Sequence, residues 1–244
     1  VVLQYPEWSH FEGVRTGAVQ RLHLSTAPSG RSGAIGISVI GAGSFAQDTL
    51  LPALRRCPGA ELRGIVTGGG VTARAVGDRY GFHYCTSNVD DIWNDQKTTA
   101  VIIATRNELH AQMIQQAIAA RKAVFVEKPL CVTSEELHAL RDEYDRAVKE
   151  NSVPLIMVGF NRRFAPLTAR VKKFFAAHGA VVSTHCRVNA GQLPAGSWVQ
   201  DPREGGGRIV SEICHFIDLL SFLASSRPAE VFAQAFRGCD EDVI

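Results

Sequence analysis

Between residues 34 and 158, short runs of apolar residues alternate with longer segments in which apolar residues recur every three or four positions. The runs are rich in Val and Ile, as is typical of strands that are buried on both faces of a parallel sheet. They predict strands at 34–40, 61–67, 82–85, 100–104, 123–126 and 154–158. The segments between them predict helices at 45–56, 72–80, 108–120 and 134–150, the last with Ser134 as its N-cap. Strands that alternate with helices form right-handed βαβ units, so we expect an α/β fold with a doubly wound parallel Rossmann sheet over 34–158.

The pattern changes after residue 158. A helix is predicted at 166–178, a β-like stretch at 180–190 and, beyond a loop rich in Gly and Pro, a second helix at 208–224. This order of elements indicates an α+β domain over 159–244. Because few residues follow the last helix and the chain starts on Val1, we expect this domain to be truncated and the chain to be an internal part of a longer protein.

Residues 1–33 are the least regular part of the chain. They end in a small, polar segment that contains Pro28, Gly30 and Gly33, which is typical of a linker, although residues 1–3 are apolar enough for a short strand. We therefore expect 1–33 to connect the Rossmann domain to whatever precedes it.

The composition places the chain among ordinary globular proteins, with 45% hydrophobic and 20% charged residues. The net charge of +2 is too small to hold a nucleic acid or an anionic membrane surface, so neither is an expected partner. No apolar run approaches the roughly 18 residues of a membrane helix, and no secretory signal is recognisable. The 6 cysteines are scattered without a zinc-site spacing, which favours reduced thiols and a cytoplasmic location.

A glycine-rich turn follows the first strand of the series. Its pattern is G-x-G-x-x-A, in which one glycine permits the tight turn, the next lets the backbone approach a pyrophosphate, and the small alanine lets helix and strand pack closely. The helix that follows supplies unpaired N–H donors and the positive end of its dipole. The pattern alone also fits a plain strand-to-helix turn, but its place at the first βαβ unit favours a dinucleotide site. The predicted contacts are Gly41, Gly43, Ser44, Phe45 and Ala46.

The end of the second predicted strand bears on the choice between NAD and NADP. It carries Thr67 and three glycines, without the Asp or Glu that usually binds the adenosine ribose of NAD. A 2′-phosphate would be accommodated by the Thr67 hydroxyl and by Arg74 on the next helix, so NADP is favoured over NAD. The alternative is that Arg74 only lies on a solvated helix face.

Several motifs occur together along the chain and are specific in combination. They are Gly41 to Ala46, Ala104-Thr105-Arg106-Asn107-Glu108-Leu109-His110, Glu127-Lys128-Pro129-Leu130, and Gly205-Gly206-Gly207 followed by His215-Phe216-Ile217-Asp218. Over about residues 35–236 the chain resembles the glucose-fructose oxidoreductase / inositol dehydrogenase / rhizopine-catabolism family, Gfo/Idh/MocA. Further segments around Asn161, Asn189 and Trp198 resemble a branch in which this module follows a zinc-type alcohol dehydrogenase-like domain. Residues 1–7 resemble the tail of that preceding domain.

The resemblance implies catalytic roles for two residues. Lys128, at the carboxyl end of a strand and beside the expected nicotinamide, would bind the reacting oxygen and offset its negative charge, aimed by a cis bond to Pro129. His215 would accept the proton of the substrate hydroxyl. The alternatives are an exposed loop lysine and a histidine on a solvated helix face.

The helix that carries His215 has two faces. An apolar stripe of Ile209, Ile213, Phe216, Leu220 and Leu223 is expected to be buried, whereas Ser211, His215, Asp218 and Phe222 are expected to face a cleft, with Asp218 orienting His215. Many family members carry an Asp where this chain has Ser211, so either the adjacent Glu212 takes that role or no carboxylate is needed. Spacing also permits a metal site at Glu212, His215 and Asp218, but no other ligand group supports one, and none is predicted.

The resemblance also implies cofactor and substrate contacts. Cofactor contacts are expected at Thr105, Asn107, His110, Glu127 and Lys128. Substrate contacts are expected at Asn161, Arg163, Asn189, Trp198 and Asp218, since amides, charged groups and an indole suit hydroxyls, phosphate and the face of a sugar. For these the alternative is packing or capping between the two domains.

Together these features predict an NAD(P)-dependent dehydrogenase that interconverts a secondary alcohol and a ketone on a sugar, polyol or nucleotide sugar. Two other functions remain open: a non-catalytic dinucleotide-binding sensor or scaffold, and a redox-assisted glycosidase. The resemblance further implies that the full-length protein forms a homo-oligomer through its second domain.

Overall fold

The computed structural model describes residues 21–24, 33–152, 155–179, 182–194 and 196–234. A seven-stranded sheet has the order β1-β4-β3-β2-β5-β6-β7, and every neighbouring pair is parallel except β1 with β4. The strands are β1 Leu22–His23, β2 Ile35–Ile40, β3 Ala60–Val66, β4 Tyr84–Thr86, β5 Ala100–Ile103, β6 Ala123–Val126 and β7 Ile156–Val158. The predicted doubly wound parallel sheet is confirmed.

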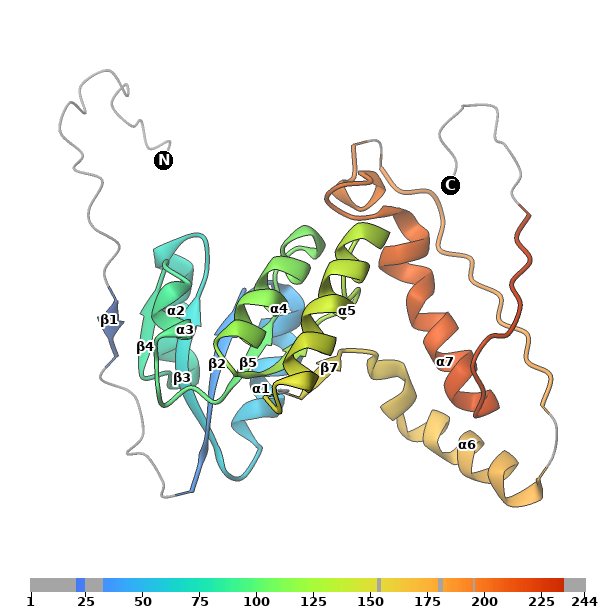
Figure 1. Ribbon diagram of the computed structural model, residues 1–244, viewed down its shortest axis with the longest axis horizontal. Helices are drawn as coiled ribbons and strands as arrows, with labels where there is room; N and C mark the ends of the chain where they lie inside the picture. The colour runs from blue at the N-terminus through green and yellow to red at the C-terminus, as the bar shows by residue number, and fades with distance from the viewer. Residues whose placement is uncertain (1–20, 25–32, 153–154, 180–181, 195, 235–244) are drawn as a thin grey trace, which may run out of the picture.

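Helices cover the sheet and continue beyond it (Figure 1). Those of the sheet domain are the π-helical turn Ala46–Leu50 that continues into α1 Leu51–Arg55, then α2 Gly70–Tyr80, α3 Asp90–Trp93, the 3₁₀ turn Asn107–Leu109 that continues into α4 His110–Ala119, and α5 Ser134–Lys149. After β7 follow the 3₁₀ turns Asn161–Phe164 and Trp198–Gln200, α6 Pro166–His178, the π-helical turn Ile209–Ile213 and α7 Cys214–Ala224.

Two apolar cores lie on opposite faces of the sheet, because neighbouring residues of a strand point to opposite sides. Val39, Ile65 and Ile102 pack with residues of α1 and α2. Their direct neighbours Ile40 and Val66 pack in the other core, with residues of α3, α4 and α5. Burial on both faces explains why these strands have no alternation of apolar and polar residues in the sequence.

Most predicted elements are confirmed to within a few residues, but helix α5 begins differently. Its N-cap is Thr133 rather than Ser134, because the Thr133 hydroxyl accepts from the Glu136 N–H at 3.2 Å while the Glu136 carboxylate accepts from the Thr133 N–H at 3.2 Å. This reciprocal pair is a capping box. The short helix α3 was not predicted, since one turn is too brief to show a periodicity.

The four residues Arg21–Leu24, which lie in the segment predicted as a linker, form an edge of the sheet. Leu22 and His23 pair antiparallel with β4, and the Leu24 N–H donates to the His83 carbonyl at 2.9 Å. The Leu24 side chain is buried against Gly77 of α2, where a Cβ would collide with it. The rest of the predicted linker, including the candidate strand at 1–3, lies outside the described residues.

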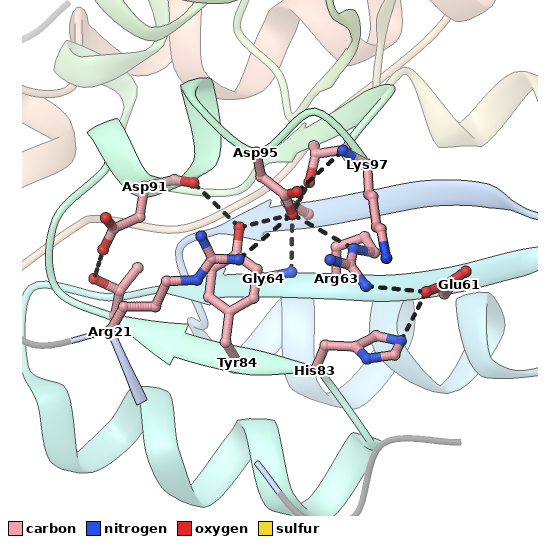
Figure 2. Close-up of polar contacts among 12 residues, drawn as sticks. Arg21, Glu61, Arg63, Gly64, His83, Tyr84, Asp91, Asp95 and Lys97 are labelled. Atoms are coloured by element: carbon pink, nitrogen blue, oxygen red, sulfur yellow. Dashed lines mark hydrogen bonds and ion pairs between the residues drawn. The ribbon is translucent and has the colours of Figure 1, made fainter. Parts of the chain in front are cut away.

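A buried polar network closes the amino ends of the strands (Figure 2). At its centre the Asp95 carboxylate accepts hydrogen bonds from the Tyr84 hydroxyl at 3.1 Å and from the Lys97 N–H at 3.0 Å. It also pairs with the Arg63 guanidinium at 3.4 Å, and Arg21 lies over the Tyr84 ring at 3.5 Å from its centre. Burial tends to raise the pKa of Asp95, but these hydrogen bonds and Arg63 hold it below its ordinary value.

Replacing Asp95 with asparagine is expected to lower the free energy of unfolding by about 2 kcal/mol, since the buried Arg63, 8% exposed, would lose one of its two carboxylate partners and keep only Glu61 at 3.1 Å. Because the pKa of Asp95 is lower in the folded protein, this stabilisation is present at neutral pH and is lost as the pH falls through the acidic range. Urea denaturation measures the change. Asp145→Asn, at an exposed 4.0 Å pair with Arg141, is the control and should cost less than about 0.5 kcal/mol. Equal losses in the two variants would contradict the expectation.

Beyond β7 the structure matches the predicted helices but not the predicted strand. α6 and α7 pack together, whereas the described residues 182–190 form no strand and are mostly exposed. The prediction of a strand at 180–190 is therefore wrong for those residues. A β-like pattern forms a strand only beside a partner strand, and none lies next to this stretch among the described residues.

Candidate active site

The glycine-rich turn has the geometry that its sequence predicts. Gly41 has a φ of +95°, and a Cβ on it would collide with the Ala104 carbonyl of the neighbouring strand end. Around Gly43, by contrast, the position of a Cβ is open space. The helical segment starts at Ser44, and its first N–H groups have no partner within the helix. The turn therefore presents N–H donors next to unfilled space.

A cavity of about 390 Å³ lies in front of this turn, at the carboxyl ends of the strands. It brings together residues that are far apart in the sequence: Gly43, Ser44, Phe45, Ala46, Ala104, Thr105, Glu127, Lys128, Asn161 and His215. Lys128 and His215, the predicted catalytic pair, thus share one cavity with the glycine-rich turn, although they are 87 positions apart in the sequence.

Lys128 follows β6 directly, and the predicted cis peptide bond to Pro129 is present. The Lys128 ammonium donates a hydrogen bond to the Ser211 carbonyl at 2.6 Å. An ammonium has three N–H donors. Two of them therefore remain for groups in the cavity.

His215 is in the neutral form that a general base requires. Burial, and then the nearby positive charges of Lys128 and Arg162, lower its pKa to about 4, although Asp218 acts in the opposite direction. The imidazole is therefore neutral at neutral pH. Its Nδ1 atom is buried and has no hydrogen-bond partner among the described residues, and the ring lies edge-on against Phe160.

His110 lies next to the site but outside it, because its side chain is completely buried and does not line the cavity. Its Nδ1 lies 2.6 Å from the Pro129 carbonyl oxygen, and its Nε2 lies 3.3 Å from the Thr105 carbonyl oxygen. Burial lowers the pKa of His110, which favours a neutral ring that donates through the shorter contact. His110 thus joins the loops that carry Thr105 and Lys128.

Two carboxylates on the His215 helix are engaged elsewhere. Asp218 forms a bidentate ion pair with Arg163, with Nε and Oδ2 3.0 Å apart, and so does not hold His215 in the way that the sequence suggests. Glu212 accepts from Arg208 one turn away, with the closer nitrogen at 2.9 Å. Neither carboxylate lines the cavity.

At the start of this helix the two faces are reversed relative to the prediction. Ile209 and Ile213 of the apolar stripe are 50% and 41% exposed, whereas Ser211 on the polar face is 3% exposed. The expectation that the apolar stripe is buried is therefore wrong for Ile209 and Ile213, whereas Phe216, Leu220 and Leu223 of the same stripe are half-buried. The polar face is buried because it finds hydrogen-bond partners on the sheet domain, including Lys128 and Asn107.

Comparison with known proteins identifies the family. Residues 35–160 match the family described as "Oxidoreductase family, NAD-binding Rossmann fold", GFO_IDH_MocA, which is more than half of the chain. The chain belongs to the Gfo/Idh/MocA family. The fusion to a zinc-type alcohol dehydrogenase-like domain stays a prediction.

Named relatives include enzymes that act on cyclic polyols and anhydrosugars. The chain is 28% identical over 196 residues to the uncharacterized oxidoreductase YrbE of Bacillus subtilis, which covers 80% of this chain and 55% of that protein. It is 35% identical over 161 residues to the levoglucosan dehydrogenase of Pseudarthrobacter phenanthrenivorans, covering 59% and 38%. It is 30% identical over 163 residues to the inositol 2-dehydrogenase of Rhizobium meliloti, covering 67% and 47%. The chain thus spans about half the length, or less, of these relatives.

Solved structures share the fold of this Gfo/Idh/MocA chain. A levoglucosan dehydrogenase in complex with NADH and levoglucosan superposes with a TM-score of 0.65 at 27% identity, covering 78% of this chain and 54% of that one. A myo-inositol dehydrogenase-like protein from Sinorhizobium meliloti superposes with a TM-score of 0.66 at 23% identity, covering 80% and 56%.

Several residues predicted for cofactor or substrate binding lie away from the cavity. The Thr67 hydroxyl donates to the Gly69 carbonyl at 2.5 Å, and Arg74, 66% exposed, pairs with Asp78 at 3.8 Å. Asn189 lies on the exposed stretch after α6, and Trp198 lies beside Arg106. Of the predicted substrate contacts, Asn161 alone lines the cavity.

Sequence reasoning missed two contributors to the site. Arg162 lowers the pKa of His215, and Gly159 leaves room for the Glu127 carboxyl group, which a Cβ there would approach to 3.0 Å. Both lie within two residues of Asn161 in the sequence, but no local pattern connects Gly159 to Glu127, 32 positions away, or Arg162 to His215, 53 positions away. Among the described residues no group of three or more His, Cys, Asp or Glu side chains is placed to hold a metal ion. No helix in the described ranges is long and apolar enough to cross a membrane.

Proposed function

We propose that this chain carries the cofactor site and the catalytic pair of an NAD(P)-dependent oxidoreductase that interconverts a secondary alcohol and a ketone on a sugar, polyol or nucleotide sugar. One observation supports it most: a single cavity contains a glycine-rich turn, the Lys128 ammonium and the neutral imidazole of His215. These are the groups that such a reaction needs for binding the cofactor, stabilising charge and moving a proton.

The residues present fit a nicotinamide dinucleotide. The turn at Gly41 and the open space at Gly43 leave room for a pyrophosphate, which would accept hydrogen bonds from N–H groups at the start of the following helix. Thr105 and Glu127 at the ends of β5 and β6 line the same cavity. When bound, the nicotinamide supplies the hydride acceptor or donor for the substrate carbon.

The protein's own part of the reaction is proton transfer and charge stabilisation. In the oxidation direction the neutral imidazole of His215 takes the hydroxyl proton of the substrate, and the free N–H groups of Lys128 bind the oxygen as it becomes negative. In the reduction direction the imidazolium returns the proton. Arg162 and Lys128 favour this return because their positive charges destabilise the protonated ring.

The substrate class is proposed from the polar side chains in the cavity lining, such as Asn161, Lys128 and His215, and from the relatives, two of which are named for levoglucosan and inositol. The NADP preference is also a proposal. It rests on the neutral Thr67 and the three glycines that follow β3 in place of an acidic residue, because the Thr67 hydroxyl and Arg74 would both have to leave their present partners, Gly69 and Asp78, to reach a 2′-phosphate.

The test is a panel of cyclic polyols, anhydrosugars and nucleotide sugars with NAD or NADP, followed by the absorbance of the reduced nicotinamide. At least one member of the panel is expected to reduce the cofactor, and fluorescence titration is expected to show tighter binding of NADPH than of NADH. Gly41→Ala, in which the new Cβ meets the Ala104 carbonyl, is the control and should lose cofactor binding.

Each other outcome indicates a different function. Cofactor binding without reduction by any substrate would contradict the dehydrogenase and favour a dinucleotide sensor or scaffold. Release of a sugar without net reduction of the cofactor would indicate redox-assisted glycoside cleavage.

A further inference from the structure

The side-chain amide of Asn107 links the sheet domain to the segment that precedes α7. Asn107 is 6% exposed, and its Nδ2 donates to the Gly205 carbonyl at 3.1 Å and to the Ser211 hydroxyl at 3.1 Å. The Ser211 hydroxyl in turn donates to the same Gly205 carbonyl. These three polar groups, from segments far apart in the sequence, thus hydrogen-bond to one another.

The orientation of this amide is determined by its partners. A carbonyl oxygen can only accept, so the NH₂ side of the Asn107 amide must face Gly205. Both of its protons are then used, one by Gly205 and one by Ser211. The NH₂ group of Asn107 therefore has no proton left to donate to a cofactor, the contact that the family resemblance implies for this residue.

Ser211 connects this joint to the catalytic ammonium. It lies within the π-helical turn Ile209–Ile213, and its main-chain carbonyl accepts from Lys128 at 2.6 Å. Gly205, the other partner of Asn107, donates its N–H to the Asp201 carbonyl at 2.9 Å and packs so closely on the main chain of Val199 that a Cβ would collide with it. Asn107 thus binds Ser211 and Gly205 to each other, and the Ser211 carbonyl in turn binds Lys128.

We propose that Asn107 is a positioning residue that fixes the direction of the Lys128 ammonium through Ser211. One N–H of Lys128 is bound to the Ser211 carbonyl, so the position of that carbonyl decides where the other two N–H groups point. The inference that this affects turnover rests on the proposed oxidoreductase function, whereas the effect on Lys128 itself does not.

The kinetic test replaces Asn107 with alanine and measures kcat and the cofactor Kd separately. A misplaced ammonium is expected to lower kcat about tenfold to hundredfold. The cofactor Kd should change by less than about twofold, since the glycine-rich turn is untouched.

Ser211→Ala removes the hydroxyl that binds Asn107 but leaves Asn107 bound to Gly205. It should therefore cause a smaller loss of kcat, and it serves as the second variant if Asn107→Ala does not fold. Glu204→Gln is the matched control, because it removes only the exposed 3.2 Å ion pair between the same two loops and should leave kcat unchanged.

A second measurement does not need a substrate. Trace acetylation followed by mass spectrometry compares the reactivity of Lys128 with that of exposed Lys149 in the same protein. Releasing the ammonium from Ser211 is expected to raise the Lys128 to Lys149 ratio at least about threefold in Asn107→Ala and not in Glu204→Gln. An unchanged ratio in folded Asn107→Ala and Ser211→Ala would overturn the proposal. A raised ratio in a protein that reduces no cofactor with any substrate would support the positioning role and reject the proposed function instead.

Discussion

Replacing Lys128 with methionine is expected to lower kcat by a factor of roughly 10²–10³, because the reacting oxygen loses the positively charged donor that stabilises it in the transition state. Methionine retains most of the length of the side chain but can neither donate a hydrogen bond nor carry a charge. The cofactor Kd should change much less, since Lys128 is one of many groups around the cavity, which also includes Gly43 and Ser44. Steady-state kinetics with a substrate from the panel, together with a fluorescence titration of the cofactor, measures both quantities.

Two further variants show whether the effect belongs to this ammonium. Lys149→Met changes an exposed lysine at the end of α5 and should leave kcat unchanged. Lys128→Arg keeps the charge but replaces a compact ammonium with a planar fork, so it should recover only part of the rate. Turnover in Lys128→Met equal to that of the unaltered protein would reject the catalytic role.

Replacing His215 with asparagine is expected to lower kcat in the oxidation direction by a factor of roughly 10²–10⁴ at neutral pH, the usual contribution of a general base. In the unaltered protein, the fall of kcat/KM at acid pH should follow the protonation of His215. Only the neutral ring can accept a proton, and the pKa of His215 is lowered to about 4, so kcat/KM should stay level as the pH falls from neutral and should decline only near pH 4.

Arg162 supplies a test of the cause of this low pKa. Its positive charge destabilises the imidazolium, so Arg162→Gln should raise the pKa of His215 and move the acid limit of kcat/KM to higher pH. NMR of the histidine Cε1 carbon gives the same pKa without any substrate. Arg141→Gln, remote from the cavity on α5, should leave the titration unchanged. A His215 that titrates near 6.5 in the unaltered protein would contradict the proposed environment.

The sheet domain could be predicted almost completely from the sequence, because its signals are local. The strands read as apolar runs, and the G-x-G-x-x-A turn identifies where the helix starts against β2. Lys128 could be placed at the end of β6 and beside Pro129, since both are adjacent in the chain to a recognisable strand. The presence of Lys128 and His215 in the predicted site is likewise supported by their common cavity.

The features that could not be predicted depend on contacts between residues that are far apart in the sequence. Arg21–Leu24 is polar in part and short, and becomes a strand only because β4 offers an open edge. Residues 182–190 have a strand-like pattern but no neighbouring strand among the described residues. In the same way, the spacing between His215 and Asp218 suggested a pair, whereas Arg163 from another segment binds Asp218 more closely.

The sequence by itself determined the doubly wound sheet, the glycine-rich turn and the choice of Lys128 and His215 as the residues proposed to carry charge and protons, because backbone sterics, periodicity and side-chain chemistry act over a few positions. The tertiary structure alone decided which face of the His215 helix is buried. Periodicity separates the polar stripe from the apolar one, but burial of Ser211 becomes favourable only where Asn107 and Gly205 satisfy its hydroxyl and Lys128 satisfies its carbonyl. Those partners lie up to 104 positions away along the chain, so their contribution to the free energy exists only in the folded protein.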